Sequence, residues 1–112
     1  MGKNSINPDW KHQFLSGRLK TSFRHFTAIV EGIAGELAGG YTCRPGHAFM
    51  TMKAWALSPD DAIDMVQAVG GGVGFVTTGH IHVFGTEPEL PPKDQAFGYD
   101  LDFTPFLNPE KK

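Results

Sequence analysis

Three histidines and one cysteine supply the side chains best suited to metal binding in this chain. His80 and His82 are one residue apart, which in a strand places both imidazoles on one face about 7 Å from each other, a spacing known in metal sites. Cys43 and His47 add a thiolate and a third imidazole if the two segments are neighbours. Such a set suits zinc or another late transition metal. Because a Pro-Gly turn separates Cys43 from His47 and their spacing matches no zinc finger, we expect no cofactor and keep zinc as the alternative.

Two carboxylates near the end of the chain offer the histidines a different role. Asp100 and Asp102 alternate with apolar residues, and a carboxylate beside an imidazole can orient it for general acid–base catalysis. A nucleophile would then be Cys43 or a threonine such as Thr77, and nothing in the sequence activates either. We prefer charge pairing between neighbouring strands or exposure to water, and an enzyme is the alternative.

Two further patterns resemble ligand sites. Residues 70–74 are rich in glycine, but phosphate-binding loops precede a helix, whereas these glycines follow a predicted helix and are expected to cap and end it. The first 26 residues interleave bases such as Lys11 and Arg18 with Trp10 and Phe14, as nucleic-acid sites do. Since the second half of the chain is acidic, we expect no nucleic-acid partner and interpret this segment as a docked amphipathic arm.

The elements that must position these side chains follow from hydrophobic periodicity. Ser58 precedes a proline and two acids, a typical helix start, and the apolar residues after it predict a helix over 59–69. Alternation predicts strands over 47–56, 75–77, 80–84 and 96–106. Prolines mark 85–96 as an extended surface loop, and an Asn-Pro-Asp start at residue 7 predicts a short helix ending near Gly17.

The segment 22–38 fits two structures. Its apolar residues, Phe26 and Val30 among them, form one stripe at helical spacing, which predicts a helix. Gly32 and Gly35 each weaken a helix by about 1 kcal/mol, and the run 26–30 fits a strand equally well. We predict the helix and keep the strand as the alternative.

The order of these elements predicts an α+β fold in a single domain, 1–112, with the ends 1–6 and 108–112 frayed. Helix 59–69 covers one face of a mainly antiparallel sheet, with additional N-terminal helical segments and a ferredoxin-like arrangement as one possibility. The expected core is Met50, Met52, Ala54, Met65, Val66, Val69, Ile81, Val83, Leu101 and Phe103.

The sheet face opposite helix 59–69 is too rich in aromatic and histidine side chains for a water-facing sheet. The contact set predicted on it is Phe49, Lys53, Trp55, His80, His82 and Phe84.

Composition limits what this face can bind. The chain has 112 residues, 40% hydrophobic and 20% charged, which excludes a disordered chain and a membrane protein. Residues 1–57 carry seven Lys or Arg and three acids, a charge of +4, whereas residues 58–112 carry three Lys or Arg and nine acids, a charge of −6. The two charges sum to the net −2. We expect one fold to interleave the two halves. With one cysteine and no signal-like stretch, a cytoplasmic location is expected.

We therefore predict a small cytoplasmic binding domain that uses this face for self-association or for a protein partner, a homo-oligomer being favoured. No membrane partner is expected, because no stretch approaches the ~20 apolar residues of a membrane span. A metal-dependent or His/Asp acid–base enzyme on the same face is the alternative.

Overall fold

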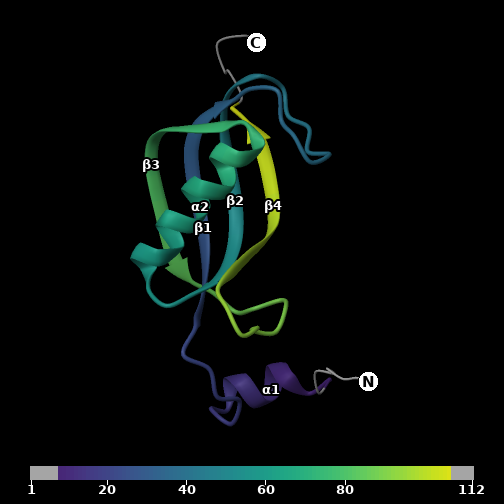
Figure 1. Cartoon of the computed structure of the whole chain (residues 1–112), viewed down its shortest axis with the longest axis vertical. Coiled ribbons are helices and arrows are strands. Elements are labelled where there is room, and N and C mark those ends of the chain that lie inside the picture. Colours follow the sequence, from purple (N-terminus) through teal and green to yellow (C-terminus); the bar gives the residue numbers. More distant parts are fainter. Residues whose placement is uncertain (1–7, 107–112) are drawn as a thin grey trace.

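The protein is a four-stranded antiparallel sheet with one long helix on one face, which confirms the α+β prediction (Figure 1). The computed structural model describes residues 8–106, so the expectation that 1–6 and 108–112 fray lies outside the described residues. The elements in chain order are α1 (Trp10–Leu15), β1 (Arg24–Ala34), β2 (Gly46–Ala56), α2 (Pro59–Val73), β3 (Phe75–Gly85) and β4 (Phe97–Pro105). No helix among the described residues is long and apolar enough to span a membrane.

The strand order is β3-β1-β2-β4, so the two strands of the first half form the centre and those of the second half form the edges. All three pairings are antiparallel. Each strand of the basic half therefore pairs with one strand of the acidic half in a single sheet. The ferredoxin-like arrangement is not confirmed: that fold alternates strands and helices as β-α-β-β-α-β, whereas here β1 and β2 are joined by the loop 35–45 without a helix.

Helix α2 starts at Pro59, as the sequence predicts. It ends at Val73, four residues beyond the predicted end at residue 69. The Ser58 hydroxyl accepts a hydrogen bond from the Asp61 backbone N–H at 3.2 Å, and Pro59 opens the first turn. The prediction that the glycines at 70–72 end the helix is wrong, because the helix continues through them to Val73. The left-handed cap is Gly74, with φ 103°.

Packing explains why the first of these glycines lies inside the helix. A Cβ on Gly70 would lie 3.2 Å from the Met50 sulfur, so the missing side chain lets α2 approach the sheet closely. Gly71 and Gly72 are exposed and meet nothing within 4 Å, so they weaken the helix without serving any contact. Burial of the face formed by Ala62, Val66 and Gly70 holds the last turn in place.

The prediction of a helix over 22–38 is wrong, since residues 24–34 form the central strand β1. The helical stripe coincides with a strand alternation in which Phe26, Ala28 and Val30 are buried under α2. Gly32, a defect in a helix, is required in the strand: a methyl group there would overlap the Val76 carbonyl oxygen and the Phe75 ring.

The core lies between α2 and the sheet and contains all of the predicted core residues. Met50, Met52, Ala54 and Val66 are fully buried or nearly so. The other predicted members are partly buried and pack against them: Met65, Val69, Ile81, Val83, Leu101 and Phe103. The buried face of the sheet is therefore the face that packs against α2. We call the opposite face of the sheet the open face.

Candidate functional site

The open face carries Phe49, Lys53, His82 and Phe84 of the predicted contact set, arranged in rows across the strands. One row runs His82, Ile29, Thr51, Asp102 from β3 to β4, and the next runs Phe84, Thr27, Lys53, Tyr99. A third contains Glu31, Phe49 and Thr104. Within residues 8–106, α2 is the only helix packed along the sheet, and it lies on the other face. Most of the open face therefore has no layer over it.

Aromatic and aliphatic side chains remain accessible on this uncovered part. Phe49 is 36% exposed and Phe84 is 47% exposed, while Ile29 and Ile33 are half-buried between their neighbours. The Phe106 ring lies 4.5 Å from that of Phe49, centroid to centroid, and extends the apolar patch toward β4. Three of these five, Ile29, Ile33 and Phe106, were absent from the predicted contact set.

Trp55, which the sequence placed in the contact set, is fully buried at one end of the open face. The Phe14 ring of α1 packs edge-on against it, with centroids 5.1 Å apart, and its indole N–H donates a 2.8 Å hydrogen bond to the Leu90 carbonyl. The arm and the loop 86–96 thus cover this end, and Pro88 of that loop is itself fully buried. Trp55 holds these segments to the sheet.

His25 lies beside Trp55, in a segment whose helical spacing does not indicate this contact. It is 4% exposed, and its Nδ1 lies 3.1 Å from the Thr86 carbonyl, which can only accept, so Nδ1 carries a proton. The Tyr99 hydroxyl oxygen accepts the backbone N–H groups of Glu89 and Leu90, so its own proton is donated to His25 Nε2 at 2.7 Å. His25 is therefore a neutral imidazole that joins β1 to β4 and to the loop.

Burial lowers the pKa of His25, and the positive charge of Lys53 lowers it further. The backbone hydrogen bond to Thr86 and the charge of Glu89 oppose these effects without reversing them. The neutral form that the hydrogen bonds require is thus also the one that the surroundings favour.

Lys53 and Asp100 form an ion pair at a bulge in β4. The register between β2 and β4 shifts by one residue there, and Asp100 takes a left-handed conformation with φ 59°. The hydrogen bond to Asp100 raises the pKa of Lys53. Lys53, a member of the predicted contact set, is therefore held in place by Asp100. From the sequence, Asp100 is expected to pair with a histidine instead.

The structure does not bring the four predicted metal ligands together. His80 and His82 are exposed neighbours on β3, with ring centroids 6.1 Å apart, whereas His47 lies on β2 next to Phe106. Cys43 packs against the core on the α2 side of the sheet. Within residues 8–106, no group of three or more His, Cys, Asp or Glu side chains is placed to hold a metal ion.

The acid–base alternative requires a histidine paired with a carboxylate, and the described part of the chain contains no such ion pair. Asp100 bonds to Lys53, and no histidine there forms an ion pair with Asp100 or Asp102. The polar contacts of the buried imidazole are with the hydroxyls of Tyr99 and Thr86 and with the Thr86 carbonyl.

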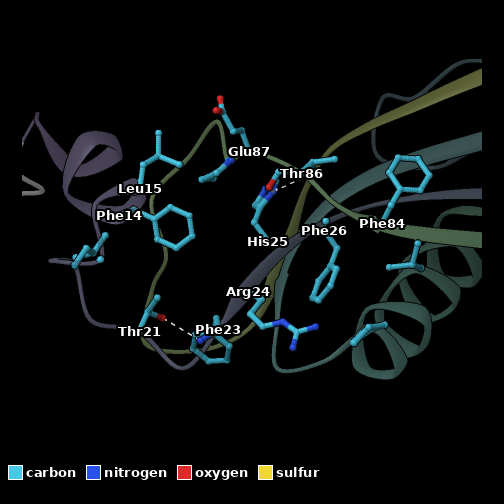
Figure 2. A pocket seen from close by; sticks show the side chains of 16 residues that line it. Phe14, Leu15, Thr21, Phe23, Arg24, His25, Phe26, Phe84, Thr86 and Glu87 are labelled. Atoms are coloured by element: carbon cyan, nitrogen blue, oxygen red, sulfur yellow. Dashed lines mark hydrogen bonds between the residues drawn. The ribbon is translucent and has the colours of Figure 1, made fainter.

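A groove of about 780 Å³ lies between the N-terminal arm and the end of the sheet (Figure 2). Its walls are mainly apolar, with Phe14 and Leu15 on the arm and Phe26 and Phe84 on the strands. Arg24 lines it on one side and Glu87 on another. The sequence did not indicate this groove, because its walls come from four separate segments.

No protein-family model matches the chain, and no curated protein and no solved structure is significantly similar to it. The geometry of the open face and of the groove is therefore the basis for the proposals that follow.

Proposed function

We propose that this protein is a binding domain that self-associates through the uncovered part of its open face. The observation that carries the proposal is the apolar patch of Ile29, Ile33, Phe49, Phe84 and Phe106 on a sheet face that α2 does not cover. A sheet face in water normally carries small polar and charged side chains at such positions.

The dimensions of the face suit a second copy of the chain. Four strands of 9 to 11 residues, about 4.8 Å apart, give the whole face roughly 650 Å² in projection, and the arm and the loop 86–96 cover one end of it. The accessible area of the side chains exceeds this projection, and a standard interface buries about 800 Å² per partner. Two such sheets can stack with their inner side chains about 10 Å deep between them.

The charges on the face are compatible with a two-fold interface. Acids and bases lie on the same surface, with Glu31 and Asp102 near His47, Lys53 and His82. A two-fold axis places each surface opposite its own copy, so a face of mixed sign can match its charges with those of the partner.

Sedimentation equilibrium of the purified protein tests this proposal. We expect a concentration-dependent dimer, and Phe49→Ser or Ile29→Ser should raise its dissociation constant at least about tenfold, because truncated apolar anchors typically cost more than 1 kcal/mol. Leu90→Ser is the matched control: this side chain is 43% exposed but lies in the loop 86–96, outside the patch. A wild-type protein that stays monomeric at millimolar concentration, or a dimer that Phe49→Ser and Ile29→Ser leave unchanged, would refute the proposal.

A further inference from the structure

The groove at the end of the sheet has the size and lining of a small-ligand site, and Phe84 is the one residue that it shares with the self-association patch. Its volume of about 780 Å³ falls within the roughly 300–1,000 Å³ typical of ligand pockets. The apolar residues that line it are Phe14, Leu15, Leu19, Phe23, Phe26, Pro59, Val83, Phe84 and Pro88. Leu15 and Phe84 are 57% and 47% exposed, so much apolar surface faces this space.

Most polar groups of the groove are already committed to the protein. His25 and Thr86 bond to each other, and the Thr21 hydroxyl accepts the Phe23 backbone N–H at 3.1 Å. The charged side chains of the lining that can face a ligand are Arg24 and Glu87, which lie on different sides of the space in Figure 2.

Arg24 is the one lysine or arginine among the lining residues, and it has no carboxylate partner within residues 8–106. Its guanidinium carbon lies 5.3 Å from the centroid of the Phe26 ring, an aromatic contact that helps to hold the side chain beside the apolar wall. A guanidinium next to apolar surface favours a carboxylate, because the planar N–H donors match two carboxylate oxygens in a bidentate pair.

We propose that this groove binds a small amphipathic carboxylate, with its carboxylate on Arg24 and its hydrocarbon body against Phe23 and Phe26. Glu87 repels an anion from the other side of the space, and this fixes the orientation of the ligand. The proposal requires no dimer, since the residues that it uses all belong to one copy of the chain.

Titration of ¹⁵N-labelled protein with 4-phenylbutyrate, followed by NMR, tests the inference. We expect saturable shifts at groove residues with a dissociation constant on the order of 1 mM or tighter, the range for a ligand of this size. The neutral analogue 4-phenylbutanamide should bind at least about tenfold more weakly, because it lacks the charge that Arg24 recognises.

Two variants separate the charge from the hydrocarbon contact. Arg24→Gln should weaken binding of the acid about tenfold and leave the amide unchanged, whereas Phe23→Ser should weaken both. Arg44→Gln removes an equal charge from the loop 35–45, at the far end of β1, and should change neither. Equal affinity for acid and amide, insensitivity to Arg24→Gln, or shifts confined to other parts of the chain would overturn the proposal.

Discussion

At the residue scale, His25 shows how position in the sheet determines chemistry. Its ring lies against Trp55, donates a hydrogen bond to the Thr86 carbonyl and accepts one from the Tyr99 hydroxyl, and it is neutral in the folded state. A protonated ring would need to donate at Nε2 as well, where the Tyr99 hydroxyl already donates. Protonation therefore disrupts the link between β1, β4 and the loop 86–96.

This arrangement makes the stability of the protein dependent on pH. Because the pKa of His25 is lowered from 6.5 in the folded state, the unfolded chain binds more protons below that pH. The free energy of unfolding should consequently fall as the pH drops below about 6.5, and level off below the lowered pKa. Urea unfolding between pH 7.5 and 5 measures this loss.

Two substitutions assign the effect to this histidine. His25→Gln should reduce the pH dependence and should cost about 1–3 kcal/mol at pH 7.5, because the buried hydrogen bonds are no longer all made. His12→Gln, at an exposed position of α1, should leave the pH profile unchanged. A wild-type profile that is flat between pH 7.5 and 5 would contradict this account.

At the element scale, glycines have opposite roles in two elements. In β1, Gly32 makes room for the Phe75 ring, which packs in the core from the start of β3. In α2, Gly71 has open space around it and adopts helical geometry. The same residue type is required by packing at one position and is a weakness at the other.

Alanine substitutions should therefore have opposite signs at the two positions. Gly32→Ala should lower the free energy of unfolding by about 2–4 kcal/mol, since the methyl group has to displace either backbone or an aromatic ring. Gly71→Ala should raise it by up to about 1 kcal/mol, the usual gain in an exposed helix interior. Thermal or urea unfolding of both variants checks this, and a destabilised Gly71→Ala would show that the last turn of α2 packs differently.

At the scale of the whole molecule, the sheet depends on pairings between the two halves of the chain. β3 pairs with β1 and β4 pairs with β2, while the strands of the second half do not pair with each other. The fragment 58–112 has no sheet of its own, and the fragment 1–57 lacks the helix that buries its core face.

We expect both fragments to be unfolded alone and to form the native sheet when mixed. Their charges of +4 and −6 should speed association at low salt and slow it at high salt. Circular dichroism and NMR dispersion measure the recovery, and stopped-flow mixing measures its salt dependence. A dispersed spectrum from 58–112 alone would contradict the expectation.

Sequence patterns alone predict the elements in which all local signals agree. The Ser58 cap, the alternation of 47–56 and the proline-rich loop between β3 and β4 were all predicted, and with them the buried core and much of the open face. Alternation also assigned Phe49, Lys53, His82 and Phe84 to one surface, because the side-chain period of a strand is a local property.

The other features of the fold and of the site depend on residues that are distant in the sequence, so only the tertiary structure shows them. Residues 24–34 form a strand since they have a pairing partner on both sides, and this outweighs a helical stripe interrupted by glycine. The same pairing brings His25 next to Trp55 and Tyr99, and it places Arg24 at the edge of a groove formed by distant segments. Periodicity shows which face of a segment is apolar, but only the assembled chain determines what that face contacts.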